Sequence, residues 1–247
     1  MLEVLAIFAK PPHPGRVKTR LTPPLTPAEA ASFQEAALRD VVGQALRHHA
    51  DVRICYDAAP GAAAYFEEAF PALPHLPQRG NDLGKRLHNA FASLFATGVE
   101  RVSIIGADAP TLPDTHLSGR FRGDGSREPV VGPTLDGGYY LIGLHRETWP
   151  RAAVLFESIP WSTDRVCEIT LDRARTAGLE PILLPAWYDI DTVEDLVAAA
   201  RDARPDSHLA RLLAQGGWSS KLASPLDDPA KSGGHSMSGS PPANSLG

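Results

Sequence analysis

Apolar side chains follow two patterns along the chain: continuous or alternating runs typical of strands, and recurrence every three or four positions typical of helices. Segments with the first pattern alternate with segments with the second. Residues 2–8 are apolar apart from Glu3, which predicts a buried first strand. From about residue 27 to residue 49, apolar side chains recur every three or four positions, as on the buried face of a helix. Residues 51–56 then alternate and include β-branched side chains, which predicts a second strand.

The same succession continues to about residue 215. Helices are expected over residues 61–70 and 82–97, with an irregular segment at 71–77 between them, and the clearest central strand follows at 101–106. The further expected elements are a helix near 114–121, a surface loop at 119–128, a strand at 129–132, a turn at 134–138, a strand at 139–144, a helix that starts at 161–164 and ends before Gly178, a strand at 181–184, a helix from Asp191 to about 201, and a helical turn or two at 205–215. Strands that alternate with helices predict an α/β fold with a mostly parallel sheet.

Two of these helix starts carry capping signals. Thr26, Pro27 and Glu29 fit the N-cap, the first and the third helical positions of a capping box. Residues 191–194 are expected to form a second capping box with Asp191 as the N-cap. Such a structural role competes with any ligand role of Asp191.

The composition favours one domain followed by a tail. With 247 residues, 43% of them hydrophobic, the chain can form one large domain or two small ones, and we expect a single domain over residues 1–218. From about Ser219 onward small and polar residues dominate. Residues 219–247 cannot bury enough apolar surface to offset the entropy of ordering, so this tail is expected to be disordered.

Composition and charge also exclude several classes of protein. No apolar run approaches the ~20 residues that span a bilayer, and residues 1–10 lack the features of a signal peptide. A net charge of −5 and a pI near 6.0 argue against nucleic-acid binding. Cys55 and Cys167 lie in apolar surroundings, so we expect buried free thiols and a cytoplasmic protein.

Common catalytic motifs are absent as well. The sequence contains no Walker A motif, no G-x-S-x-G and no G-x-G-x-x-G. This disfavours P-loop nucleotide hydrolysis, α/β-hydrolase chemistry and a standard dinucleotide fold.

Residues 10–20 follow the first predicted strand and contain three prolines and one glycine, Gly15, which forbid regular structure. The same loop holds four cations, at Lys10, Arg16, Lys18 and Arg20. One interpretation is a solvated basic turn. The other is a cradle for a phosphate chain, in which Lys acts as a point charge and Arg as a fork. Open α/β sheets bind ligands at the carboxyl ends of their strands, so the position favours the cradle.

Three aspartates are candidates for the same edge of the sheet. Asp108 directly follows the strand at 101–106, where its carboxylate could hold a hard cation through oxygen. The alternative is a turn-forming Asp that precedes an X-Pro step. Asp189 and Asp191 lie two positions apart and share a face if the chain is extended. Because Asp189 has no capping role, it is the better candidate for a second metal ligand or a general base.

Two glycine-containing segments have both a structural and a functional interpretation. Asn81, Asp82 and Gly84 lie at a predicted helix N-terminus, where polar ligands are favoured, but Asp82 could equally be the N-cap. Residues 136–138, Asp-Gly-Gly, fit a tight turn, yet two glycines also let a backbone approach a ligand closely. Tyr139 follows directly and would face one side of the next strand.

Several motifs, taken together and in order, resemble the DUF2064 family. The matching segments span about residues 2–200 and are 8–21, 78–84, 106–112, 132–144, 161–164 and 189–192. Members of that family are described as glycosyltransferases of the GT-A, nucleotide-diphospho-sugar transferase superfamily. The resemblance implies a three-layer αβα sandwich with a mostly parallel central sheet.

The resemblance also implies a site. The superfamily binds a nucleotide over the carboxyl end of the sheet, with Mg²⁺ or Mn²⁺ on an aspartate, and that role would fall on Asp108. The chain reads Asp108-Ala109-Pro110 where many sugar transferases have Asp-X-Asp, so Asp189 or Asp191 would complete the metal shell. The cations of residues 10–20 match the place where nucleotidyltransferases of the superfamily hold a triphosphate.

The implied reaction is transfer of a sugar from a nucleotide-diphospho-sugar to a small acceptor. The alternative follows from residues 17–21, Val-Lys-Thr-Arg-Leu, which are similar to guanylyltransferases. In that reaction a nucleoside triphosphate gives its nucleotide to a phosphorylated small molecule and pyrophosphate leaves. A third hypothesis is a nucleotide-binding module without turnover.

These arguments predict four groups of site residues. They are Asp108, Asp189 and Lys18 in catalysis; Lys10, Gly15, Arg16, Lys18, Arg20, Asn81, Asp82 and Gly84 in nucleotide or phosphate binding; Asp136, Gly137, Gly138 and Tyr139 in substrate binding; and Asp108, Asp189 and Asp191 at Mg²⁺ or Mn²⁺.

Overall fold

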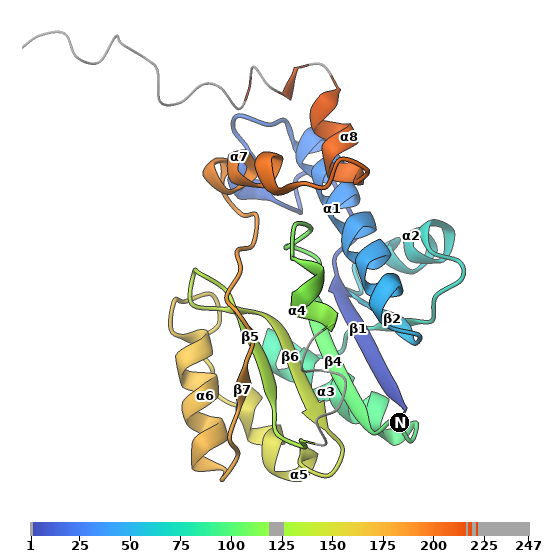
Figure 1. The fold of residues 1–247 in the computed structure, drawn as a ribbon. Coiled ribbons are helices and arrows are strands. Elements are labelled where there is room, and N and C mark those ends of the chain that lie inside the picture. Colours follow the sequence, from blue (N-terminus) through green and yellow to red (C-terminus); the bar gives the residue numbers. More distant parts are fainter. Residues whose placement is uncertain (1, 119–125, 216, 219–220, 222–247) are drawn as a thin grey trace, which may run out of the picture.

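The computed structural model describes residues 2–118, 126–215, 217–218 and 221 of the chain. The strands of this described part are β1 (Glu3–Ala9), β2 (Val52–Tyr56), β3 (His75–Pro77), β4 (Arg101–Gly106), β5 (Val130–Pro133), β6 (Tyr139–His145) and β7 (Ile182–Leu183). They form one sheet in the order β3-β2-β1-β4-β6-β5-β7 (Figure 1).

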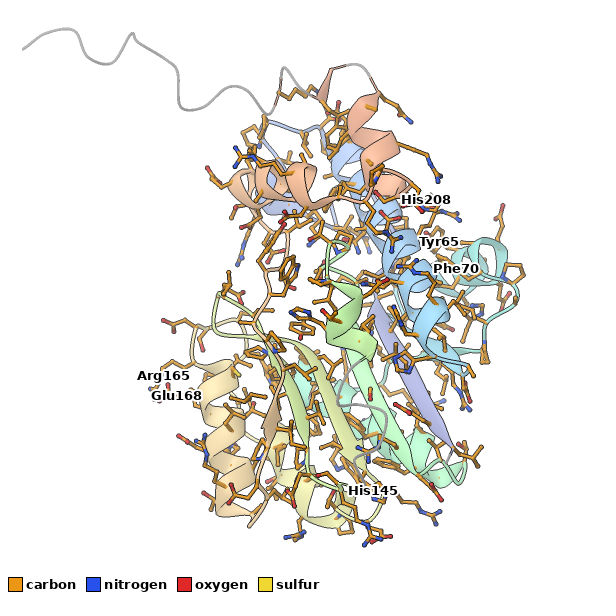
Figure 2. All side chains as sticks on the ribbon, viewed as in Figure 1. Tyr65, Phe70, His145, Arg165, Glu168 and His208 are labelled. Carbon is orange, nitrogen blue, oxygen red and sulfur yellow. The ribbon has the colours of Figure 1, made fainter. Side chains whose placement is uncertain are left out.

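One strand of the sheet runs against the others. Neighbouring strands are parallel except in the two pairs that β6 makes with β4 and β5, which are antiparallel. The carboxyl ends of the other strands and the amino end of β6 therefore lie at one edge of the sheet. His145, at the carboxyl end of β6, lies at the opposite edge (Figure 2). The predicted mostly parallel α/β sheet is confirmed.

Helices cover both faces of the sheet. Those of the described residues are α1 (Pro27–His48), α2 (Ala62–Ala69), α3 (Leu83–Ala96), α4 (Asp114–Ser118), α5 (Trp149–Ala152), α6 (Val166–Thr176), α7 (Val193–Asp202) and α8 (His208–Ala214), with 3-10 turns η1 (Thr19–Leu21) and η3 (Ala153–Phe156). In the view of Figure 1, α1 and α4 lie in front of the sheet and α3 lies behind it.

The alternation along β1 shows why there are three layers. Leu5 and Ile7 join a buried cluster with side chains of α1, α2 and α4. Val4 and Ala6 point to the other face and pack with α3, α5, η3 and α6. Successive side chains of a strand point to opposite faces of the sheet. A strand that is apolar throughout therefore requires helices on both faces. The predicted αβα sandwich is therefore confirmed.

The last two helices close the end of the sheet where the parallel strands finish. Leu196 of α7 and Leu209 of α8 share a third buried cluster with Leu21, Phe33 of α1 and Ile190. In Figure 1, α7 and α8 lie at the same end of the molecule as the loop that follows β1. The C-terminal part thus packs directly against the predicted phosphate loop.

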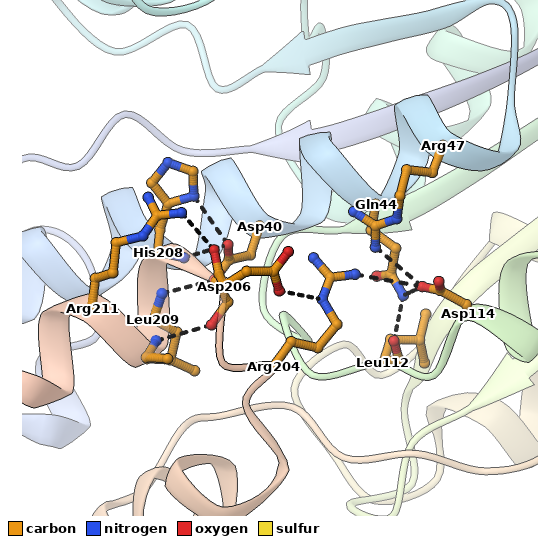
Figure 3. A network of polar contacts seen from close by, with 12 residues as sticks. Asp40, Gln44, Arg47, Leu112, Asp114, Arg204, Asp206, His208, Leu209 and Arg211 are labelled. Carbon is orange, nitrogen blue, oxygen red and sulfur yellow. Dashed lines mark hydrogen bonds and ion pairs between the residues drawn. The ribbon is translucent and has the colours of Figure 1, made fainter.

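A buried carboxylate fastens α8 to α1. Asp40 is 5% exposed and accepts hydrogen bonds from the backbone N–H groups of His208 at 2.7 Å and Leu209 at 2.8 Å (Figure 3). The Nδ1 atom of His208 lies 3.1 Å from the same carboxylate. Asp40 therefore satisfies donors that the first turn of a helix leaves without an intrahelical partner.

The capping box of α1 is confirmed, whereas that of α7 is shifted by one residue. Thr26 accepts from the N–H of Glu29, and the Glu29 carboxylate accepts from the N–H of Thr26. In α7 the N-cap is Thr192, paired with Asp195, so the prediction that Asp191 is the N-cap is wrong. Asp and Thr are both good N-caps, and acidic residues follow each at a usable spacing. The Asp191 side chain is consequently free of the capping role and can make other contacts.

Other differences concern short elements. Residues 75–77, predicted to be irregular, form β3 because they pair in parallel with β2 at the edge of the sheet. Neither α5 nor η3 is predicted from the sequence, because each is too short to show a period. The helix predicted to start at 161–164 begins at Val166, and the preceding Ser162 has a left-handed φ of 67°.

The remaining expectations have mixed outcomes. Cys55 and Cys167 are buried free thiols, as predicted. No helix among the described residues is both long and apolar enough to cross a bilayer. The predicted tail at 219–247 lies outside the described residues apart from Lys221, and so do residues 119–125 of the predicted loop.

Candidate active site

A cleft of about 560 Å³ opens at the edge of the sheet where the parallel strands end. Its charged lining comprises Lys10, Arg16, Lys18, Arg20, Arg86, Asp108, Asp189 and Asp191. Its apolar lining includes Phe8, Leu83, Leu87, Ile104, Tyr139, Tyr140, Ile142 and Trp161. A groove of similar volume, about 570 Å³, lies between α1 and α8 and contains none of the predicted site residues.

The order of the strands explains how distant residues meet in the cleft. Lys10 follows β1, and Asp108 follows the adjacent β4 by two residues. Tyr139 begins β6, which is next to β4 and antiparallel to it, so its start lies at the same edge. The cation of Lys10, the carboxylate of Asp108 and the phenol of Tyr139 therefore line the same cleft, each at the end of one of three neighbouring strands.

The segment after β7 carries two more carboxylates across this edge. Trp187 donates its N–H to the carbonyl of Pro133 at 3.1 Å, and Ile190 donates its N–H to the carbonyl of Asp108 at 2.9 Å. The second bond fixes Asp189 and Asp191, which flank Ile190, beside Asp108. The three aspartates therefore line one cleft, and their predicted role as metal ligands stays a prediction.

Lys18 is embedded among these carboxylates. Its Nζ lies 2.6 Å from Oδ1 of Asp108 and 3.0 Å from Oδ1 of Asp191, and it donates to the carbonyl of Ile190 at 2.7 Å. The side chain is only 4% exposed. Burial alone would lower the pKa of Lys18, but the charges and hydrogen bonds of Asp108 and Asp191 outweigh it and raise that pKa. Lys18 is therefore a cation in this site.

The carboxylates themselves differ in their electrostatics. Burial opposes ionisation of Asp108, but Lys18 and, more weakly, Lys10 hold its pKa below the usual value. Burial and then the like charge of Asp108 raise the pKa of Asp189 to about 7, against the opposing effect of Lys18. Asp136 and Asp191 add further like charge. The cleft therefore holds more negative charge than Lys18 neutralises.

This excess charge leads to a pH-dependent effect on stability. Asp189 has a folded-state pKa of about 7 against an ordinary 3.8, so between these values the folded protein binds more protons than the unfolded chain. Stability then falls as pH rises through this range. With about 1.4 kcal/mol per unit of pKa and some screening by the cleft, Asp189→Asn is expected to stabilise the protein by about 2 kcal/mol at pH 8.

Urea denaturation in the presence of a chelator, at pH 4.5 and pH 8, measures this effect. The gain in the free energy of unfolding should vanish at the lower pH, where Asp189 is protonated and resembles Asn. Glu67→Gln, at an exposed position of α2, is the control and should change little at either pH. An equal gain at both pH values would contradict the assignment.

The donor set fits a divalent cation that shares its shell with a ligand. Asp108 and Asp189 supply hard oxygen donors, and burial together with the charge of Asp108 raises the pKa of Asp189, which a nearby cation would lower. Among the described residues no three Asp, Glu, His or Cys side chains converge closely enough to hold a metal ion by themselves. Mg²⁺ commonly takes one or two carboxylates plus substrate phosphates, so the arrangement suits Mg²⁺ or Mn²⁺ in that form.

The other cations of the loop differ from Lys18. Lys10 and Arg16 line the cleft, are exposed, and form no ion pair with any residue that the structure describes. Arg20 is 71% exposed and lies 3.5 Å from Asp191. Gly15 has a left-handed φ of 75° and lies outside the cleft lining, where it shapes the loop. The loop therefore presents free cations to the cleft.

The first turn of α3 contributes other residues than those predicted. Asp82 is exposed and caps α3 by accepting from the N–H of Lys85 at 2.7 Å. Asn81 is exposed, and neither residue is part of the cleft lining. Gly84 is buried, and a Cβ there would collide with the Phe156 carbonyl and crowd the Trp161 ring. A ligand role for these three residues stays a prediction, whereas Asp82 and Gly84 have visible structural roles.

The Asp-Gly-Gly turn also has a structural role. The Asp136 carboxylate accepts from the N–H of Gly138 at 3.1 Å. Gly137 has a φ of 88°, and a Cβ there would collide with the backbone of Asp164. Of this predicted group only Tyr139 lines the cleft, and burial raises its pKa. Contact of Asp136, Gly137 or Gly138 with a substrate stays a prediction.

The cleft also contains residues outside the predicted set, among them Gln78, Arg86, Trp161 and Ser162. Gln78 donates to the carbonyl of Cys55 at 2.7 Å, and Arg86 pairs with Asp57 at 2.7 Å. Trp161 and Ser162 come from the turn before α6. The strand-end rule would have indicated Gln78, which follows β3, had that strand been predicted.

Comparison with known proteins places this geometry in a family. The family described as "Uncharacterized protein conserved in bacteria (DUF2064)" matches residues 41–163. No curated protein matches the sequence. A crystal structure of a "putative nucleotide-diphospho-sugar transferase" from Desulfovibrio desulfuricans G20 is 30% identical, with a TM-score of 0.82 over 90% of this chain and 96% of that one.

More distant structures share the fold. A 4-diphosphocytidyl-2C-methyl-D-erythritol synthase is 16% identical, with a TM-score of 0.56 over 82% of this chain and 98% of that one. A CMP:2-keto-3-deoxy-manno-octonic acid synthetase, solved with CTP, is 15% identical, with a TM-score of 0.53 over 81% and 98%. The similarity at 30% identity covers nearly all of both chains, and the family match includes the central strand and Asp108. The chain therefore belongs to the DUF2064 family.

Proposed function

We propose that this protein is a metal-dependent transferase that takes a nucleotide-diphospho-sugar and passes its sugar to a small acceptor. The observation that carries the proposal is the meeting of Asp108 and Asp189 with the free cations Lys10 and Arg16 in one cleft. A diphosphate needs both kinds of group: carboxylates for its metal ion and cations for its remaining charge. The similarity at 30% identity to a protein described as a nucleotide-diphospho-sugar transferase agrees with this choice.

The residues would act chiefly by positioning and by electrostatics. Mg²⁺ or Mn²⁺ bound by Asp108 and Asp189 would supply positive charge to the diphosphate that leaves. Lys10 and Arg16 would bind the same phosphates, so that the charge developing on the leaving group is stabilised as the acceptor attacks the anomeric carbon. The apolar side of the cleft, with Tyr139 and Trp161, would hold the acceptor in line and exclude water.

Nucleotidyl transfer is the second candidate, and the cationic loop is the observation that favours it. A triphosphate carries more charge than a diphosphate, and four cations would suit it better. Lys18, however, is already neutralised inside the protein, which leaves Lys10, Arg16 and Arg20. The charge argument for a triphosphate is weaker than the sequence alone implies.

A turnover screen with mass-spectrometric detection tests the proposal. The purified protein, with Mg²⁺ or Mn²⁺, meets a panel of nucleotide-sugars and nucleoside triphosphates, each with pooled small acceptors. We expect a nucleoside diphosphate to be released from one sugar donor and the sugar to appear on an acceptor. Release of pyrophosphate from a triphosphate would select the second candidate instead. Nucleotide binding without any release would indicate a binding module.

A further inference from the structure

All three donors of the Lys18 ammonium are used inside the protein. An ammonium has three N–H donors, and here they face Asp108, Asp191 and the carbonyl of Ile190 at 2.6, 3.0 and 2.7 Å. None remains for a phosphate. Lys10 and Arg16, on the same loop, are exposed and unpaired among the described residues. Lys18 therefore differs from Lys10 and Arg16, because its hydrogen-bond donors are already bound inside the protein.

The backbone holds the ammonium in this place. Lys18 has a left-handed conformation with φ 47° and ψ 41°, which is uncommon for a residue other than glycine. Its side chain is 4% exposed and passes above the ring of Phe33, with Nζ 5.9 Å from the ring centroid. Such a conformation persists only where the surroundings enforce it.

We infer that Lys18 is a built-in counter-ion that blocks the metal position on Asp108 until a phosphate draws it away. The inference rests on the proposed function, since it takes Asp108 as a metal ligand. The Lys18 ammonium, 2.6 Å from Oδ1 of Asp108, already neutralises this carboxylate, and it repels a divalent cation that approaches the same group. The phosphates of a donor would offer Lys18 a new partner as the metal ion takes its place. Metal and donor then bind together, and neither binds tightly alone.

Binding of Mn²⁺ alone, with no nucleotide present, tests this inference. Electron paramagnetic resonance of the free aqueous ion gives the dissociation constant directly. We expect weak binding to the wild-type protein and binding at least tenfold tighter to Lys18→Met, because the carboxylates then lack a counter-ion. Lys18→Gln is the second variant; it keeps a hydrogen-bond donor for Ile190 and should bind Mn²⁺ similarly, even if the methionine variant fails to fold.

Two control variants test whether the gain in Mn²⁺ affinity arises at Asp108. Lys85→Met removes one positive charge at an exposed position outside the cleft, so its Mn²⁺ affinity should stay within twofold of wild type. Adding Asp108→Asn to either Lys18 variant should abolish the gain. Lys18 variants that bind Mn²⁺ no tighter than wild type, or a gain that survives Asp108→Asn, would overturn the inference.

Failure of the inference and failure of the proposed function give different results. If the wild-type protein transfers a sugar and requires a metal, but the Lys18 variants gain no Mn²⁺ affinity, then the proposed function is supported and the counter-ion role of Lys18 is wrong. If the Lys18 variants gain Mn²⁺ affinity that depends on Asp108, but no donor is turned over, then the counter-ion role is supported and the proposed function is wrong.

Discussion

Asp108→Asn is expected to lower turnover of the sugar donor by about a thousandfold and to leave the fold intact. Removing one group that stabilises developing charge commonly costs a factor of a hundred to a thousand. Asp108 would have such a role, since its carboxylate would hold the metal ion that stabilises the leaving diphosphate. Asparagine has nearly the same shape, and Lys18 keeps its contacts to Asp191 and Ile190.

Steady-state kinetics with the best donor from the screen measures this loss, with the thermal unfolding midpoint recorded in parallel. Asp172→Asn makes the same change of charge on the exposed side of α6, where Asp172 pairs only with Arg175 among the described residues. Its turnover should lie within twofold of wild type. Full activity of Asp108→Asn would remove Asp108 from the catalytic site.

Asp40→Ala is expected to destabilise the protein by about 3 kcal/mol. Two backbone N–H groups, of His208 and Leu209, lose their acceptor, and each unsatisfied buried donor costs about 1–3 kcal/mol. The change also removes the contact that fastens α8 to α1. Because α8 contributes Leu209 to the cluster that contains Leu21, the loop at residues 10–20, which leads into Leu21, should loosen as well.

Urea denaturation at constant pH measures this prediction through the midpoint and the slope. Asp206→Ala is the matched control, because the Asp206 side chain is 81% exposed and pairs with Arg204, although Asp206 belongs to the same network of polar contacts as Asp40 in Figure 3. Its effect should be below about 0.5 kcal/mol. A loss below 1 kcal/mol in Asp40→Ala would mean that α8 is held by its apolar contacts alone.

The sequence predicts the parts of the site that follow from strand ends. Lys10 and Asp108 come directly after long apolar strands, and a parallel sheet brings such positions to one edge whatever the details of packing. The residues alone make Asp189 a candidate second metal ligand because it has no capping role, and the resemblance then pairs it with Asp108, although β7 has only two residues.

Other features depend on tertiary contacts that no local pattern contains. Lys18 looks like any other cation of its loop, and its partner Asp191 lies 173 positions further along the chain. The sequence does not distinguish the α7 caps, because Asp191 and Thr192 are both competent; in the structure Thr192 caps the helix and the Asp191 carboxylate pairs with Lys18. The position of Trp161 depends on Gly84, which lets the two segments approach.

The bond from Ile190 to the carbonyl of Asp108 has a consequence for the order in which the site is assembled. A ribosome makes Lys18 among the first residues and Asp191 near the end of the domain. The carboxylate that shares Lys18 with Asp108 arrives only when the segment after β7 has crossed the sheet edge. A nascent chain shorter than 191 residues therefore holds the cationic loop and Asp108 without Asp191, and the charge balance of the cleft is complete only after the segment after β7 has docked.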